Sequence, residues 1–555
     1  MVIRKPIVPL PRLPSRKASI KSGDRSEDIL LTLRRVSETL GVRRVKELYV
    51  KKADAKQIKY RLIILLTIAI LTTAWGLASL IYTPLKMLLS IRLEMTPGLP
   101  PYEWWATPPD EILLSVFVFN ITNSEAFMNG TDKKIRVQEI GPIIYKEKLE
   151  HINPKVNPNG TLSYTANRTA VFLPEMNTIN LNDTIIVPNL GVLLIPAYFH
   201  DSSMFIKLGV NMLLRSFKAQ PLVKMTIYDY LWNATDPILE PAEKLAPSLV
   251  PTRNVGLLNI IYQDFSNNVT LLIGKKNGDA KFFTIDTYDG SPYLPHFSDP
   301  KCQLKFRNAS EGIGYPQMLT KDANLTYWRK TLCKQADIRY ERDERKFGIN
   351  GYRFKLMPYT FYREGWEGND DCFAGDPTLP NGIADVSPCY WGFPIAASFP
   401  HFLYGDEALQ SKIDGLTPNE EEHGSHVLID PVTGIPLAGK ARAQINLVMK
   451  KLWGFPKNIQ TFSDTYLPLA WLEYNQIGLP WYIKGMVYYM AVIVPVCQLP
   501  FSLISLSIAG VCIYFIFGLM VGRLGTAEKG HTMSNRLLKR ESQAFIHYDN
   551  NDCEL

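Results

Sequence analysis

The sequence contains little cysteine and none of the common motifs of enzyme active sites. Its 555 residues include seven cysteines, too few for a fold held together mainly by disulfide bonds. It lacks a Gly-x-Ser-x-Gly elbow, a phosphate-binding P-loop, a His-Glu-x-x-His zinc motif and a glycine-rich dinucleotide-binding turn after a strand. No acid–base pair or activated nucleophile can be assembled from it. We therefore predict that the protein is not an enzyme and needs no cofactor.

The closest approach to a metal-binding motif is the pair His423 and His426, which follows three glutamates at positions 420–422. Neighbouring proline and glycine residues predict a loop rather than a helix that would hold both rings on one face. We therefore expect a solvated acidic turn and predict no metal site. Gly312 and Gly314 are followed by Tyr-Pro and not by a helix, which also excludes a phosphate loop.

Positive charge is scarce outside one segment, although the formal net charge is +8. Residues 1–61 carry 17 Lys and Arg against 6 Asp and Glu, a net charge of +11, and residues 523–555 carry 5 of each kind. Residues 62–522 are therefore left with a net charge of −3. Nucleic-acid binding requires basic residues spread over a folded domain, so we predict no nucleic-acid partner.

Two runs contain no charged residue at all. Residues 62–83 are long enough to cross a hydrocarbon layer of ~30 Å, and their distance from the N-terminus favours a retained signal anchor. The second run is longer than one span requires. Pro495 and Pro500 are expected to divide it into a membrane-surface lead-in, residues 485–498, and a helix, residues 499–522. We predict a membrane protein with two transmembrane helices.

The tails and the segment between the spans are expected on opposite sides of the membrane. Lys and Arg concentrate before the first span, which predicts that residues 1–61 and 523–555 are cytoplasmic. Residues 1–61 are expected to be partly disordered. A basic amphipathic helix from Ser26 onward either binds anionic headgroups or reflects only the usual cytoplasmic excess of Lys and Arg. Residues 84–484 then form an extracellular or luminal domain.

Glycosylation and cysteine signals agree with this topology. All nine Asn-X-Ser/Thr triplets lie between the spans, which predicts a glycosylated surface. Their asparagines are Asn120, Asn129, Asn159, Asn167, Asn182, Asn233, Asn268, Asn308 and Asn324. The same segment contains Cys302, Cys333, Cys372 and Cys389. An even number of cysteines in an oxidising compartment predicts two disulfide bridges, and the sequence leaves three pairings open.

The outer segment is expected to be rich in β-structure. Residues 112–122 predict a strand of β-branched and aromatic residues. Residues 257–274 predict a hairpin with its turn at 266–268. Residues 281–288 and 437–452 predict two further strands, the second less regular.

One stretch, residues 201–218, predicts an amphipathic helix instead. Asp201 or Ser202 is expected to cap it, and Arg215 and Lys218 lie near its end. These two cations either complement the helix dipole or contact a ligand. The recurring apolar residues are Met204, Phe205, Leu208, Met212 and Leu213.

Nine short motifs occur in a fixed order over about residues 105–446. They are Trp105-x-x-Pro108-Pro109, residues 118–123, 137–145, 231–237, 381–389, 398–403, 414–423, 430–434 and 444–446. The most specific are Asn-Gly-Ile-Ala-Asp-Val-Ser-Pro-Cys at 381–389 and Ser-Phe-Pro-His-Phe-Leu at 398–403. In these motifs and in its two spans, the sequence resembles the class B scavenger receptor family. That family includes fatty-acid and lipoprotein scavenger receptors, a lysosomal integral membrane protein and sensory neuron membrane proteins.

The resemblance implies a fold and a function. The fold is a mixed, β-rich ectodomain built on an irregular antiparallel β-barrel, with a helical apical cap and a hydrophobic tunnel that leads to the bilayer. The function is that of a cell-surface receptor that binds lipid or lipoprotein ligands at the cap and passes lipid to the membrane. The implied partners are fatty acids, sterols or carotenoids and their lipoprotein-like carriers.

The resemblance also assigns residues. Residues 201–218 fall where the family builds its cap, so Arg215 and Lys218 are expected to bind ligands, although Ser216 stands where some members carry a second lysine. The family's bridges correspond here to Cys302–Cys372 and Cys333–Cys389.

Three alternatives remain open at this stage. The same fold serves trafficking or adhesion receptors and chemosensory coreceptors, and a two-span ligand-gated ion channel shares the topology. A homo-oligomer or a coreceptor complex is also compatible with the sequence. Leu537 and Leu538 lack the acidic residue of a lysosomal dileucine signal, which favours the plasma membrane over an endosomal or lysosomal membrane.

Overall fold

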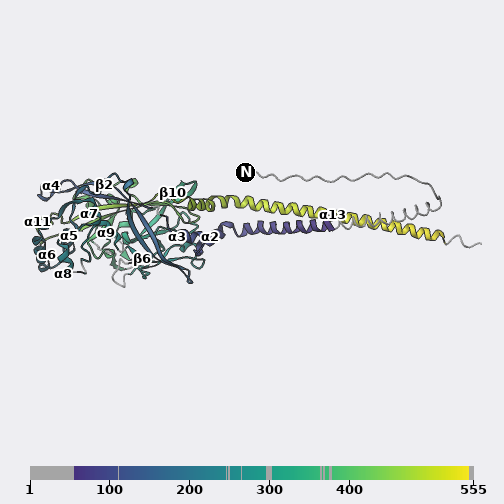
Figure 1. Cartoon of the computed structure of the whole chain (residues 1–555), viewed down its shortest axis with the longest axis horizontal. Coiled ribbons are helices and arrows are strands. Elements are labelled where there is room, and N and C mark those ends of the chain that lie inside the picture. Colours follow the sequence, from purple (N-terminus) through teal and green to yellow (C-terminus); the bar gives the residue numbers. More distant parts are fainter. Residues whose placement is uncertain are drawn as a thin grey trace, which may run out of the picture. The chain divides into compact units, whose positions relative to one another are not determined.

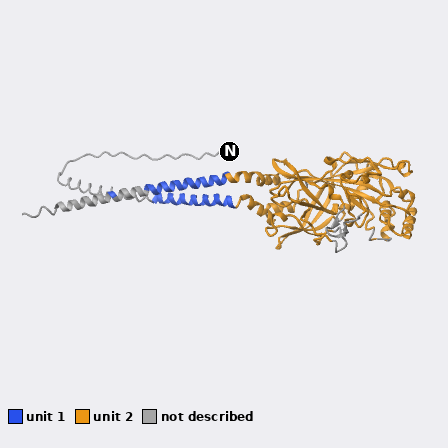
Figure 2. Cartoon of the chain, turned by 180° about the vertical axis from the view of Figure 1, so that it is seen from behind, with its two compact units in different colours: residues 1–81, 500–555 blue, residues 82–499 orange. Residues whose placement is uncertain are grey.

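The computed structural model of the chain divides into two compact units (Figure 2). Unit 1 contains Met1–Ile81 and Pro500–Leu555, and unit 2 contains Tyr82–Leu499. The structure describes residues 56–109, 112–245, 247, 250–263, 265–294, 303–362, 365–366, 369–373 and 378–548. The amphipathic helix expected from Ser26 lies outside these residues.

The described part of unit 1 consists of two long apolar helices. The helix Lys56–Ile81 and the helical stretch Trp481–Gly522, which begins in unit 2, are both long and apolar enough to cross a membrane. Within unit 1 the two helices contact each other at small residues. The hydroxyls of Ser79 and Ser502 hydrogen-bond at 2.6 Å, and a Cβ on Gly76 would lie 3.0 Å from the Leu506 side chain. Small residues allow this close approach of two membrane helices.

The second span differs in detail from its predicted division at two prolines. α12 (Trp481–Tyr488) continues through a π-helical segment (Tyr489–Ile493) into α13 (Val494–Tyr548). Pro500 lies inside α13 and does not end it. A proline within a membrane helix is tolerated because local helical adjustments and neighbouring groups satisfy the freed carbonyl.

Unit 2 is built on one large, mainly antiparallel sheet (Figure 1). Its strand order is β7-β6-β3-β2-β1-β19-β18-β17-β11-β10-β9-β8, and β14, β15 and β16 attach to its side. Two small pairs, β4–β5 and β12–β13, are separate. The strands are β1 (Ile112–Ile121), β2 (Ile135–Asn157), β3 (Thr161–Phe172), β4 (Thr184–Pro188), β5 (Leu222–Thr226), β6 (Ser266–Leu272), β7 (Ile285–Tyr288), β8 (Ala309–Ser310), β9 (Leu325–Arg329), β10 (Lys334–Lys346), β11 (Ile349–Leu356), β12 (Gly365–Trp366), β13 (Asn369–Phe373), β14 (Ile383–Asp385), β15 (Ile395–Ser398), β16 (Ile413–Asp414), β17 (His426–Ile429), β18 (Pro436–Met449) and β19 (Thr465–Gln476).

The sheet nearly closes into a barrel, as predicted. Its central strand β1 pairs with β2 on one side and β19 on the other, and Leu114, Val116 and Val118 are fully buried along it. The two ends of the sheet approach each other. The centres of the rings of Tyr288 in β7 and Trp328 in β9 lie 5.6 Å apart. The alternation of β-branched and aromatic residues therefore predicts β1 correctly.

Helices cover both ends of unit 2 (Figure 1). α6 and α11 lie at the end opposite to α2 and α3. The helices of unit 2 are α2 (Pro84–Glu94), α3 (Pro100–Ala106), α4 (Ser124–Met128), α5 (Leu190–Tyr198), α6 (Met204–Ser216), α7 (Ile227–Trp232), α8 (Leu239–Leu245), α9 (Leu257–Tyr262), α10 (Glu420–His423), α11 (Lys457–Gln460) and α12.

The hairpin predicted at residues 257–274 is wrong. Its first half is α9, whose buried residues Leu257, Leu258 and Ile261 share one helical face. The expected turn at 266–268 is instead the start of β6, where Ser266 and Asn267 pair with β3. The predicted strand at 281–288 shortens to β7, and the one at 437–452 is present as β18, whose pairing with β19 shifts register between Ile445 and Asn446.

Candidate functional site

A large cavity of about 310 Å³ lies inside unit 2. Its lining includes residues of helices as well as of strands. At one end it is bounded by Leu190 and Leu194 of α5 and by residues of α9. At the other end it is bounded by Trp104 and Trp105 of α3 and by Ile483 of α12. Most of the exposed lining is apolar, as in sites that bind lipids or other hydrophobic ligands.

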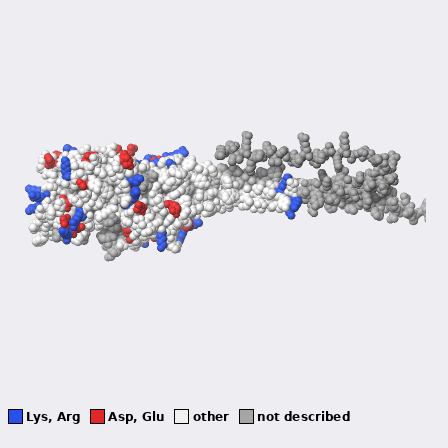
Figure 3. Space-filling model, viewed as in Figure 1, with Lys and Arg blue, Asp and Glu red and all other residues white. Residues whose placement is uncertain are grey.

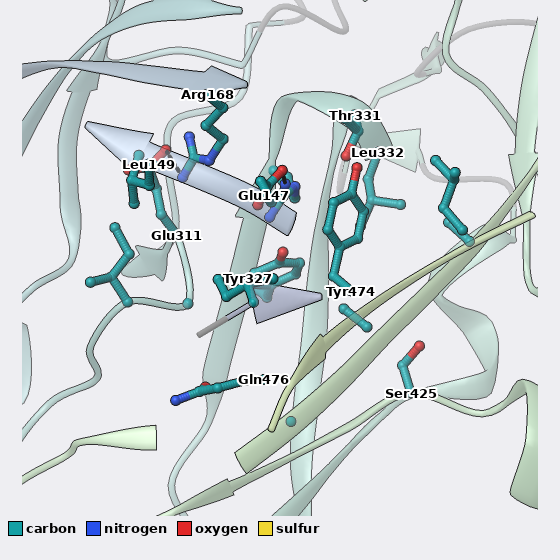
Figure 4. Close-up of a pocket in the computed structure, with 18 of the residues that line it drawn as sticks. Glu147, Leu149, Arg168, Glu311, Tyr327, Thr331, Leu332, Ser425, Tyr474 and Gln476 are labelled. Carbon is teal, nitrogen blue, oxygen red and sulfur yellow. Dashed lines mark hydrogen bonds and ion pairs between the residues drawn. The ribbon is translucent and has the colours of Figure 1, made fainter. Parts of the chain in front are cut away.

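β19 and β2 place alternate side chains in the cavity, as the two-residue period of a strand predicts. Leu472, Tyr474 and Gln476 of β19 line it. Glu147 and Leu149 of β2 also line it (Figure 4). Of these, Glu147 is an acid in a row of mainly apolar, inward-facing residues.

The cavity lining includes seven Lys, Arg and Glu residues, and we call the four that form two buried ion pairs the internal girdle: Glu147, Arg168, Glu311 and Arg329. Nη2 of Arg329 donates to Oε1 of Glu147, which also accepts a 2.8 Å hydrogen bond from the Tyr262 hydroxyl. The Arg329 guanidinium lies 3.8 Å from the centre of the Tyr474 ring. The exposed fractions of the paired side chains are 9% for Arg329 and 1% for Glu147.

The other half of the girdle is also an ion pair. Nη2 of Arg168 lies 3.7 Å from Oε1 of Glu311, and the Tyr164 hydroxyl donates to Oε2 of Glu311 at 2.6 Å. Burial alone would lower the pKa of Arg168, but Glu311, Glu147 and Tyr288 together outweigh it and raise that pKa. Burial, together with Glu311, raises the pKa of Tyr164, so its hydroxyl remains a donor. Each carboxyl group of the girdle therefore faces an arginine and accepts a hydrogen bond from a tyrosine hydroxyl.

The girdle is not evident from the sequence. Its members come from β2, β3, β9 and the residue after β8, which only the folded sheet brings together. The available signal was an ionisable residue at an inward position of a strand, as at Glu147 between Tyr145 and Leu149.

Arg215 and Lys218 lie outside the cavity, at the end of α6 and just beyond it, and both are exposed. The predicted helix is present as α6. Its N-cap is Ser203 and not the expected Asp201 or Ser202. Figure 3 shows Lys and Arg side chains gathered at the end of unit 2 that carries α6 and α11. α6, which the structure describes in full, contributes no residue to the cavity lining.

The apolar side of α6 faces outward, contrary to the usual arrangement of an amphipathic helix. Phe205 is 87% exposed. The buried residues are Lys207, Val210 and Leu214, and the Lys207 ammonium lies 4.2 Å from the centre of the Trp453 ring. We call the exposed apolar surface the α6 patch: Met204, Phe205, Leu208, Met212 and Trp453.

Cys333 and Cys389 are joined by a disulfide bond, with their Cα atoms 5.8 Å apart. This is one of the two pairs that the family resemblance implies. The other pair involves Cys302, which lies outside the described residues, and Cys372, which is in β13.

The nine glycosylation asparagines all lie among the described residues of unit 2. Asn120 and Asn167 are half-buried, and the Asn120 side-chain oxygen accepts a 2.9 Å hydrogen bond from the Ile186 N–H. The other seven are exposed: Asn129, Asn159, Asn182, Asn233, Asn268, Asn308 and Asn324.

The solvated turn expected around His423 is wrong. His423 ends the short helix α10 and is buried, with its ring stacked 4.2 Å from that of His401. His401 Nε2 and Trp471 Nε1 each lie 2.7 Å from Oε2 of Glu139. Burial alone would raise the pKa of Glu139, but these two hydrogen bonds outweigh it and lower the pKa.

Glu139, His401 and His423 are close enough to hold a metal ion, but their hydrogen bonds do not fit one. The backbone N–H of Thr417 donates to Nδ1 of His401, and that of Asn419 donates to Nδ1 of His423. A neutral imidazole that accepts at Nδ1 carries its proton on Nε2. A metal-binding histidine instead donates from its second nitrogen. The cluster is therefore a hydrogen-bonded support, and His426 belongs to β17 and not to it.

Comparison with known proteins agrees with this architecture. Residues 63–521 match the model of the CD36 family. Scavenger receptor class B member 1 of Rattus norvegicus is 27% identical over 409 residues, which cover 73% of this chain and 79% of that protein. Lysosome membrane protein 2 is 29% identical over 379 residues in Rattus norvegicus, covering 67% and 77%, and 28% identical over 372 residues in Homo sapiens, covering 66% and 74%.

The family match extends across both candidate spans and the whole described part of unit 2. Its two-span topology agrees with the two apolar helices, so the chain is a membrane protein. The resemblance inferred from the motifs is confirmed, and the chain belongs to the CD36 family, the family of the class B scavenger receptors.

Proposed function

We propose that the chain is a receptor that binds lipid or lipoprotein ligands at the α6 patch and passes lipid through the cavity to the membrane. The observation that supports this proposal is the apolar cavity in unit 2, whose lining includes residues of α5 and of α3. Each CH₂ removed from water contributes about 0.8 kcal/mol, so a chain of ~16 carbons gains on the order of 10 kcal/mol on entering it. Such a transfer needs no covalent step, and we propose no enzymatic activity and no cofactor.

The α6 patch supplies the docking surface in this proposal. A monomeric soluble protein rarely exposes clustered large apolar side chains without a binding role. Arg215 and Lys218 border the patch and would attract anionic headgroups at the surface of a lipid particle. Fatty acids, sterols and carotenoids, with their lipoprotein-like carriers, are the partners proposed.

The proposed topology places residues 84–484 outside the cytoplasm and both tails inside it. Glycans on the exposed asparagines and the Cys302–Cys372 bridge belong to this proposal. We propose the plasma membrane as the site of action, and an endosomal or lysosomal membrane as the alternative, since the relatives include a lysosome membrane protein.

Uptake of a fluorescent lipid presented on lipoprotein particles tests the function. Cells that express the chain should take up more lipid than mock-transfected cells, and equal uptake would refute lipid transfer. The double variant Arg215→Glu and Lys218→Glu should bind anionic particles several-fold more weakly. Unchanged particle binding by this variant would remove both residues from the site.

The alternatives give different results in the same cells. A trafficking or adhesion receptor, or a chemosensory coreceptor, would show no extra uptake, but a protein partner would be recovered with residues 84–484. A two-span channel would produce a ligand-gated current in oocytes. Crosslinking in intact cells would reveal a homo-oligomer.

A further inference from the structure

The internal girdle contains one buried donor that makes no hydrogen bond of ordinary geometry with the described residues. This donor is the Nε–H of Arg329. Nη2 of Arg329 is used by Glu147, and the face of its guanidinium is covered by Tyr474. A buried polar group without a partner is rare in native proteins and costs stability, so each one requires an explanation. Arg329 lines the cavity, and a ligand in the cavity can supply the missing acceptor.

The charges around this donor decide which acceptor suits it. Glu147 and Arg329, and Glu311 and Arg168, are two opposite-charge pairs, so the girdle has no net charge. The charges that act most strongly on Arg168 are those of Glu311, Arg329 and Glu147, so the two pairs lie within reach of each other. An added carboxylate would have to be desolvated beside a neutral belt whose positive charges are already paired. An uncharged oxygen accepts the same hydrogen bond without that cost.

The lining around the girdle limits the chemistry of the rest of the ligand. The rest of the lining is mainly apolar and includes residues of α5, α9, α3 and α12. A ligand that satisfies Arg329 therefore needs a long apolar body attached to a small polar group. A lipid without any oxygen would fill the same space but leave the donor unpaired.

We propose that the Nε–H of Arg329 forms a selectivity site in the cavity for lipids that carry an uncharged oxygen, such as a hydroxyl or a carbonyl group. This inference rests on the proposed transfer of lipid through the cavity and specifies which lipids bind best there. Oxygen-free lipids and ionised fatty acids bind more weakly than alcohols of the same chain length.

Three matched probes test the site: 1-hexadecanol, hexadecane and palmitate at pH 7.4. The full-length chain in lipid nanodiscs is incubated with an equimolar mixture, and the bound probes are extracted and quantified against empty nanodiscs. Wild type should enrich 1-hexadecanol about tenfold over hexadecane, the size expected for a hydrogen bond from a charged donor. It should also enrich 1-hexadecanol over palmitate.

Two variants and a control attribute the preference to Arg329. Arg329→Lys keeps the charge that pairs with Glu147 but removes the Nε–H, and should reduce the preference for the alcohol to below about twofold. The double variant Glu147→Met and Arg329→Met removes the pair in an apolar form and should have the same effect. Arg253→Lys is the control, because Arg253 lies outside the cavity lining and its Nε–H donates to Glu243 at the surface.

The outcomes separate the inference from the proposed function. Equal enrichment of hexadecanol and hexadecane by wild type, equal enrichment of palmitate, or a preference retained in Arg329→Lys overturns the inference alone. No enrichment of any probe above empty nanodiscs overturns both the inference and the proposed lipid-carrying cavity. Loss of the preference in Arg253→Lys also overturns the assignment to Arg329.

Discussion

The cavity and the α6 patch invert the usual distribution of side chains in opposite ways. The cavity buries two ion pairs within an apolar lining, whereas α6 buries Lys207 and exposes Phe205. Buried charges are costly unless they are paired, and exposed large apolar side chains are unfavourable unless they bind something. Both regions therefore place side chains where they are costly for stability, and both are regions where lipid is proposed to bind. Substitutions in each region should therefore show whether that region contributes to stability or to binding.

The largest effect is expected from breaking the girdle. Arg329→Ala leaves Glu147 as a buried, unpaired carboxylate and should destabilise the protein by about 3–5 kcal/mol. Thermal unfolding of the purified protein measures this loss. Lys321→Ala is the control, because it breaks the exposed pair with Asp343 and should leave the unfolding temperature unchanged. Equal behaviour of the two variants would contradict the buried character of the girdle.

A slightly smaller loss is expected from the disulfide bond. Replacing both Cys333 and Cys389 by Ser should destabilise the folded chain by about 2–4 kcal/mol, because the reduced unfolded chain gains conformational freedom. Unfolding under non-reducing conditions provides the measurement. Reduction of wild type should produce a shift at least as large, because it would also open the proposed Cys302–Cys372 bridge. A variant as stable as oxidised wild type would show that the Cys333–Cys389 bond contributes nothing.

The pH dependence of stability is expected to follow the buried histidines. Burial, and then the adjacent His401, lowers the pKa of His423 from 6.5 to about 4. Between these pH values the unfolded chain binds a proton that the folded chain does not. The contribution of this group is therefore fully present above pH 6.5 and is lost as the pH falls toward 4. We expect about 1–3 kcal/mol from it.

His423→Gln should reduce the slope of stability against pH in that window, measured by denaturant unfolding from pH 7.5 to 4. The slope should not vanish, since burial also lowers the pKa of His151 to about 3 and that of His426 to about 4. An unchanged slope in the variant would exclude His423 as a contributor.

The smallest effect on stability, but a clear effect on binding, is expected at the α6 patch. Replacing Phe205 and Leu208 by Ser should leave the unfolding temperature unchanged because both side chains are already exposed. Binding of lipid particles should fall roughly tenfold as the lost apolar contact area predicts. Particle binding equal to wild type would show that the patch is not the docking surface.

The two regions were also unequally predictable from the sequence. The ordered motifs and apolar runs predicted the family, the two spans and the strand β1. The hairpin predicted for residues 257–274 is wrong because the pattern is ambiguous. Two short apolar runs around an Asn-rich step fit a hairpin and a helix followed by a strand equally well. The outward face of α6 depends on the loop around Trp453, which packs over Lys207, and periodicity alone cannot report such a partner. The girdle is formed by residues distant in the chain. The sequence could at most have indicated single acids and bases at inward strand positions, not their pairing.

The central claim is that lipid crosses unit 2 through the cavity, and filling that cavity tests it most directly. Ala441 and Ala443 of β18 line the cavity, and replacing both by Trp should block it while the exposed α6 patch remains intact. Ala408→Trp, at an exposed position, is the matched control. We predict that cells with the filled cavity bind lipid particles as wild type does but take up lipid no faster than mock cells. Uptake at the wild-type rate through the filled cavity would contradict the account.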